Sequence, residues 1–178
     1  MNKLKISIVL LALSVFGGCY SDRINDFETI IIQVPLNQQM VNYGDSKETR
    51  TPDNLHNYPE YRDNIDRIRS IQIYQVAYHA DNVIPEEAMD ARFKSMEFFV
   101  ETGGKRYKIA RFEDVSVEDM YRIPHIDQVD DETAKEISDR LLADPAFYTV
   151  SIFDPYANQY FDRIISTMVV VVKIEITI

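Results

Sequence analysis

Few side chains in this chain have a type and spacing that could support bond making. Cysteine occurs once, as Cys19, and the three histidines are His56, His79 and His125. No two histidines have the i, i+4 spacing of a helical zinc site, and no serine stands in a G-x-S-x-G pattern. We therefore expect each histidine to be solvated or locally hydrogen-bonded. The sequence predicts no catalytic residue, no metal site and no cofactor.

Carboxylates cluster before a predicted helix, at Asp127, Asp130, Asp131 and Glu132, and a second group lies nearby in sequence, at Glu113, Asp114, Glu118 and Asp119. Calcium requires six to eight oxygens around one point, and the EF-hand spacing is absent. A helix cap with a solvated acidic surface is the favoured interpretation, and calcium binding stays open. Paired carboxylates can also hydrolyse a glycosidic bond, so a metal- or carboxylate-dependent hydrolase of an envelope polymer is one alternative function.

The chain has eleven tyrosines and no tryptophan. Exposed rings can stack on sugars or on a partner protein, whereas packing within the rim and core is the competing interpretation. We name four tyrosines in predicted loops as candidate binding residues, and a row of rings on one sheet face would indicate a carbohydrate-binding module. These candidates are Tyr43, Tyr58, Tyr61 and Tyr156.

Residues 1–18 have the pattern of a secretory signal peptide. Lys3 and Lys5 form a basic head, an apolar run from Ile6 to Phe16 follows, and two glycines precede the thiol of Cys19. This order matches the three regions that such a signal requires. The apolar run is shorter than the roughly 20 residues that span a bilayer as a helix, so we expect a cleaved leader.

The segment from Val15 to Cys19 (VFGGC) resembles the lipobox of bacterial lipoproteins. The resemblance implies that the Cys19 thiol receives a diacylglycerol, that residues 1–18 are removed and that the new amino terminus is acylated. Several acyl chains give a stable anchor, whereas one chain binds only marginally. In enteric-type lipoproteins an Asp after the lipidated Cys favours retention in the inner membrane. This chain has Tyr20 at that position, which resembles lipoproteins sorted to the outer membrane. The implied location is the cell envelope, lipid-anchored, at the outer membrane.

Composition is that of an ordinary globular domain, with 46% hydrophobic and 27% charged residues. The formal net charge is −10, and loss of the two leader lysines makes the mature chain more acidic still. An acidic domain repels phosphate backbones, so we exclude nucleic acid as a partner. The expected partners are the membrane, through the N-terminal lipid, and an envelope protein or glycan.

The first half of the mature chain predicts strands separated by a long loop. After a tether at 19–26, residues 27–34 form a strand that Pro35 ends, and 37–64 form a surface loop. Residues 68–80 form a strand whose apolar side switches, which indicates a bulge. Residues 92–112 form a hairpin around Gly103-Gly104.

The second half predicts one amphipathic helix at 130–143, a strand at 146–153 and a long final strand at 164–178. This order, which includes the hairpin residues Lys108-Ile109-Ala110, resembles the small immunoglobulin-like β-sandwich domains of bacterial lipoproteins. The resemblance implies a mostly β fold, a single antiparallel β-sandwich over 27–178. We expect a non-catalytic envelope lipoprotein that acts as an anchored interaction or structural module.

Overall fold

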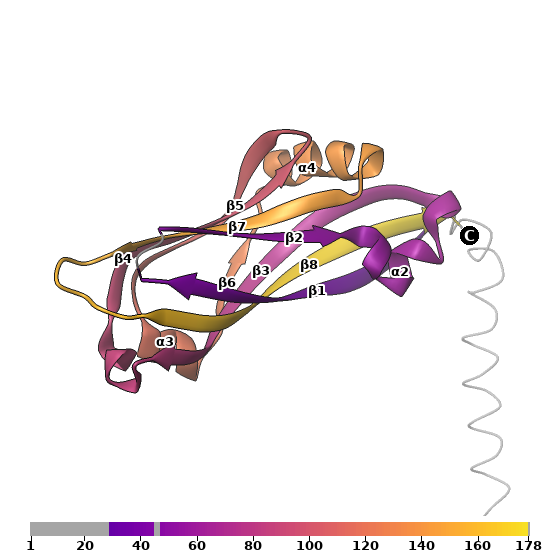
Figure 1. The fold of residues 1–178 in the computed structure, drawn as a ribbon. Coiled ribbons are helices and arrows are strands. Elements are labelled where there is room, and N and C mark those ends of the chain that lie inside the picture. Colours follow the sequence, from indigo (N-terminus) through magenta and orange to yellow (C-terminus); the bar gives the residue numbers. More distant parts are fainter. Residues whose placement is uncertain (1–28, 45–46, 178) are drawn as a thin grey trace, which may run out of the picture.

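The computed structural model describes residues 29–44 and 47–177, which fold into two four-stranded antiparallel sheets packed against each other (Figure 1). The predicted signal peptide (1–18), Cys19 and the tether to residue 26 lie outside the described residues. The prediction of a mostly β, two-sheet antiparallel sandwich is confirmed.

The eight strands divide equally between the sheets. The first sheet has, in spatial order, β1 (Thr29–Tyr43), β8 (Arg163–Thr177), β3 (Ile68–Ile84) and β6 (His125–Gln128). The second has β2 (Glu48–Asn54), β7 (Ala146–Pro155), β4 (Arg92–Thr102) and β5 (Lys105–Ser116). The described helices are α2 (Pro59–Arg62), α3 (Val117–Arg122) and α4 (Asp131–Ala143), with 3-10 turns η2 (Leu55–Asn57), η3 (Ile65–Arg67) and η4 (Glu86–Asp90).

The strand order is that of a jelly roll. Every connection except the β4–β5 hairpin carries the chain from one sheet to the other. Eight strands in the orders 1-8-3-6 and 2-7-4-5 wind as two Greek keys, whereas immunoglobulin-type sandwiches have sheets of the ABED and CFG kind. The immunoglobulin-like prediction is therefore wrong. Strand periodicity reports which side of a strand is buried, but not the sheet that the strand joins.

Pro35 does not end the first strand. β1 continues through it to Tyr43, and Pro35 lies opposite Val171 of β8. An edge strand tolerates proline because one side of its backbone has no strand to bond, and β1 is an edge strand. The predicted loop at 37–64 is wrong for the same reason: it contains the second half of β1, all of β2 with Pro52, and α2.

Other local predictions are confirmed. Gly103 and Gly104 have φ of 56° and 75°, the positive values that a two-residue hairpin turn requires. The β3–β8 register shifts between Ile73 and Gln75, which is the predicted change of side. The helix at 130–143 is α4, and the Asp130 side chain accepts a hydrogen bond from Thr133 N at 2.9 Å.

The core lies between the sheets and is closed by helices at its sides. Alternate residues of β8 are buried from Ile164 to Ile176. Aromatic rings fill the centre, where Tyr78 lies 4.9 Å from Phe98 between ring centroids. The apolar side of α4 is buried and covers β3, with Ile71 N donating to Ser138 Oγ at 3.3 Å.

The two ends of the sandwich are built differently (Figure 1). Thr29 pairs with Thr177, so β1 begins and β8 ends at the same end, beside α2. We call this the anchor end, since it is where the chain arrives from the N-terminal side. The opposite end, which we call the tip, is formed by the turn after Tyr43 and by the connection between β7 and β8.

Candidate interaction surfaces

The tip connection is held in place by backbone hydrogen bonds to two strands. Gly44 N, just after β1, donates to Asp162 O at 2.9 Å. Asp162 N donates in turn to Ile84 O, at the end of β3, at 2.7 Å. A Cβ added at Gly44 would stand 1.9 Å from Phe161 O, so only glycine allows this approach. The segment therefore lies across the end of the first sheet in one defined path.

A cleft of about 390 Å³, which we call the tip cleft, opens between this connection and the end of β1. Tyr43 is 49% exposed and Tyr160 is 70% exposed beside it. Phe161 is buried and packs on Phe93 with 5.6 Å between ring centroids, which fixes the connection to the core. The cleft is lined by Tyr43, Gly44, Pro155, Gln159, Tyr160, Phe161 and Asp162.

The polar groups of the tip cleft are partly engaged. The Tyr160 hydroxyl donates to the Asp162 carboxylate, and this hydrogen bond raises the pKa of Tyr160. Gln159 Oε1 accepts from Arg92 N at 3.0 Å, while its NH2 group has no partner among the described residues. The residues that line the cleft therefore include a carboxylate and an amide beside two exposed rings.

A second tyrosine–aspartate contact lies next to the cleft. Tyr156 OH donates to Asp114 Oδ1 at 3.3 Å, and Arg92 binds the same oxygen at 2.7 Å. The hydrogen bond and charge of Arg92 lower the pKa of Asp114. Asp114 also adopts a positive φ of 50°. These contacts among Tyr156, Asp114 and Arg92 hold the start of the tip connection, at the end of β7, against β4 and β5.

The four predicted tyrosines separate into two pairs. Tyr43 and Tyr156 lie at the tip, whereas Tyr58 and Tyr61 lie at the anchor end. Tyr61 is only 4% exposed, so it packs in the core and offers no ring face to a ligand. Tyr58 packs against the core and donates its hydroxyl to Asp53 Oδ2 at 2.7 Å.

Tyr160 flanks the same predicted turn as Tyr156 but was not among the four candidate binding residues, although it is the more exposed of the two tyrosines that line the cleft. The only sequence signal for it is its position after the turn that begins at Asp154-Pro155. Its closeness to Tyr43 depends on the pairing of β1 with β8, in which Tyr43 lies opposite Arg163. No spacing rule connects two residues so far apart in sequence.

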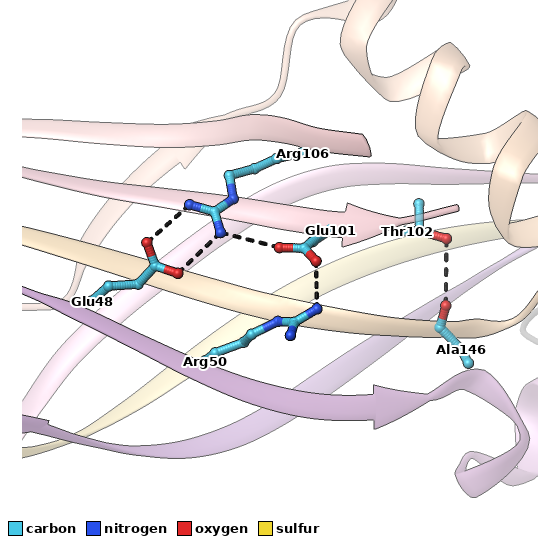
Figure 2. Close-up of polar contacts among 6 residues, drawn as sticks. All are labelled: Glu48, Arg50, Glu101, Thr102, Arg106 and Ala146. Atoms are coloured by element: carbon cyan, nitrogen blue, oxygen red, sulfur yellow. Dashed lines mark hydrogen bonds and ion pairs between the residues drawn. The ribbon is translucent and has the colours of Figure 1, made fainter. Parts of the chain in front are cut away.

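The outer face of the second sheet is occupied by its own ion pairs (Figure 2). Arg106 of β5 binds both carboxylate oxygens of Glu48 at 3.0 Å and Glu101 at 3.1 Å. Glu101 also pairs with Arg50, whose guanidinium lies 3.6 Å from the ring centroid of Tyr148. Val150 of β7, which lies opposite Arg50 of β2, is fully buried. The charges there are engaged with each other, which is a structural role.

The histidines lie apart and bind locally. His79 is the most engaged, with Nδ1 3.2 Å from Asp81 Oδ1 and Nε2 2.9 Å from Tyr121 O. His56 packs edge-on against Tyr61, and His125 against Phe112. Within residues 29–44 and 47–177, no group of three or more His, Cys, Asp or Glu side chains could hold a metal ion. In the same part of the chain, no helix is long and apolar enough to cross a membrane.

Comparison with known proteins finds no matching family model and no matching curated relative. Several solved viral structures are distantly similar. A turnip yellow mosaic virus structure has a TM-score of 0.41 and 10% identity, covering 84% of this chain and 82% of its own. A desmodium yellow mottle tymovirus structure has 0.38 and 7%, covering 84% and 89%. The decameric BFDV capsid protein has 0.38 and 7%, covering 82% and 98%. The jelly-roll assignment rests on the strand order itself.

Proposed function

We propose that this protein is a non-catalytic lipoprotein of the cell envelope, anchored in the outer membrane through acyl chains on Cys19. Its sandwich serves as an interaction module that presents the tip cleft to an envelope partner. The anchor rests on the basic head, the apolar run and the small residues that precede Cys19. The module rests on the geometry of the described residues.

The observation that carries this proposal is the path of β1. This strand has fifteen residues, a length of about 50 Å, and it leads from the anchor end to the tip cleft. Thr29 follows Cys19 by ten residues, which can span at most about 35 Å. An anchor at Cys19 therefore keeps the start of β1 near the membrane, and Tyr43 is carried outward at the far end of the same strand.

The charge of the domain limits the partner. At −10 overall, the chain repels nucleic acid and acidic polymers. The charged side chains of the second sheet pair with one another, whereas two exposed rings and the polar side chains of Gln159 and Asp162 line the tip cleft. An envelope protein or a glycan is the class of partner that fits this surface.

Replacement of the thiol tests the anchor. Cys19→Ser is expected to abolish labelling by radioactive palmitate and to move the protein out of the detergent-extracted membrane fraction. Ser21→Ala, two residues later, is the matched control and is expected to behave as wild type. If the Cys19→Ser protein stays in the membrane fraction as firmly as wild type, the anchor is wrong.

A further inference from the structure

We propose that the tip cleft binds a neutral oligosaccharide chain. This inference rests on the proposed function, because it names the partner class of that interaction module. The cleft combines exposed tyrosine rings, an acceptor carboxylate and a donor amide, which together match the surface of a sugar.

The rings supply a stacking platform. Tyr160 and Tyr43 line the cleft and are 70% and 49% exposed. The face of an aromatic ring carries partial negative charge, so it attracts the C–H groups on the flat side of a pyranose. The Asp162 carboxylate accepts a hydrogen bond from the Tyr160 hydroxyl, which favours the ring position that the structure shows.

The polar groups match hydroxyls. A sugar hydroxyl both donates and accepts, and the Asp162 carboxylate keeps acceptor capacity beyond its bond from Tyr160. Gln159 offers an NH2 donor that has no partner among the described residues. A hydroxyl that donates to an ionised carboxylate makes the stronger, charge-assisted kind of hydrogen bond. Adjacent hydroxyls of one sugar ring can therefore use both groups.

The cleft is formed before any ligand arrives. The Gly44–Asp162 and Asp162–Ile84 backbone bonds fix the connection, and Phe161 is inserted against Phe93. A rigid site loses less conformational entropy on binding than a mobile loop does. This matters for a weak, hydroxyl-based ligand, because the gain from each contact is small.

The charge of the cleft selects a neutral chain. The Asp162 carboxylate accepts a hydrogen bond from the neutral Tyr160 hydroxyl, so this lining residue gives the cleft a negative charge. A uronic acid or sulfated sugar would place a like charge nearby, at a site within an acidic protein. Neutral hexoses and N-acetylhexosamines avoid this repulsion.

The test uses the full mature lipoprotein in a detergent without a sugar headgroup. Maltohexaose, cellohexaose, mannohexaose and chitohexaose are titrated by calorimetry, with hexagalacturonate as the charged comparison. We expect at least one neutral hexasaccharide to bind, and hexagalacturonate to bind at least about tenfold more weakly.

Three variants locate the site. Tyr160→Ala and Asp162→Asn are each expected to weaken binding about tenfold, because one removes the platform and the other the ionised acceptor. Tyr148→Ala removes a ring that is 38% exposed on the outer face of the second sheet, away from the tip cleft, and is expected to change affinity less than about twofold. Circular dichroism of each variant confirms that the fold is retained.

Binding of none of the four neutral chains overturns the inference, as does equal weakening by Tyr160→Ala and Tyr148→Ala. Equal binding of hexagalacturonate overturns the choice of a neutral ligand. These failures are separate from failure of the anchor. A protein that leaves the membrane when Cys19 is replaced, yet binds no sugar, retains the proposed function and loses only this inference.

Discussion

Both ends of the sandwich contain a tyrosine whose hydroxyl binds an aspartate, but the two pairs have opposite surroundings. At the anchor end Tyr58 binds Asp53 while packed against the core, and burial together with this hydrogen bond raises the pKa of Tyr58. At the tip Tyr160 binds Asp162 while 70% exposed. The same pair of side chains stabilises the packed structure at the anchor end, whereas at the tip it is exposed to solvent.

The difference follows from what each connection buries. The chain between β2 and β3 makes helical turns that insert Leu55 and Tyr61 into the core, so this connection is part of the packed interior. The connection between β7 and β8 has a single buried apolar residue, Phe161, and its neighbour Tyr160 stays in solvent. A connection that buries one apolar side chain can hold a fixed position while its other side chains stay exposed to a ligand.

The largest contrast is expected between alanine substitutions at the two ends. Tyr61→Ala removes a buried ring and leaves a cavity, so we expect a loss of about 3–5 kcal/mol in the free energy of unfolding. Tyr160→Ala removes a solvent-exposed ring and is expected to leave the urea midpoint unchanged. Urea unfolding followed by circular dichroism measures both. If the two variants unfold at the same urea midpoint, the predicted difference between the buried connection at the anchor end and the exposed connection at the tip is wrong.

A substitution at Gly44 is expected to damage the tip in spite of its small size. Gly44→Ala places a methyl group against the Phe161 carbonyl, so the connection must shift, at a cost of about 1–3 kcal/mol. Proton–nitrogen NMR spectra should show shifts concentrated at 155–163, with the anchor end unchanged. If the spectrum of Gly44→Ala overlays that of wild type, the tip is not held by this close approach.

Removal of one hydroxyl at a time sharpens the comparison of the two pairs. Tyr58→Phe deletes a bond to a carboxylate in a partly buried setting and is expected to cost about 1–2 kcal/mol. Tyr160→Phe deletes the corresponding bond in solvent, where water replaces it, and its urea midpoint should match wild type. A larger loss from Tyr160→Phe than from Tyr58→Phe would contradict the assignment of roles.

The same pair of variants has a pH signature. The pKa of folded Tyr58 is raised above the value of about 10 expected for an unfolded tyrosine. The native state then holds its proton where the unfolded state releases it, so this contribution is complete below pH 10 and is lost as pH rises above 10. Tyr58→Phe should make the alkaline decline in stability shallower. Burial also raises the pKa of Tyr78, so part of the alkaline decline in stability should remain in the Tyr58→Phe variant.

Features that depend on neighbours in sequence could be predicted. The Asp130 cap of α4, the positive φ angles at Gly103-Gly104 and the alternation of the last strand each follow from local backbone and side-chain chemistry. Pro35 was misjudged because its effect depends on whether the strand lies at an edge, which is a property of the sheet. The four candidate tyrosines were predicted to be exposed because they lie in polar segments. A polar segment can still insert a ring into the core, as the segment around Tyr61 does.

The amino-acid sequence by itself determined that the chain is a β-rich domain containing the capped helix α4, because strand alternation and capping act over a few residues. The single predicted helix was too few, since the structure also has α2 and α3, and α3 is capped by Ser116. It also contains the predicted leader and Cys19, on which the proposed anchor depends. Only the tertiary structure decided the jelly-roll order and the placement of Tyr43 and Tyr160 at one cleft. These features arise when strands far apart in sequence pair, and such pairing depends on the packing of the whole sandwich.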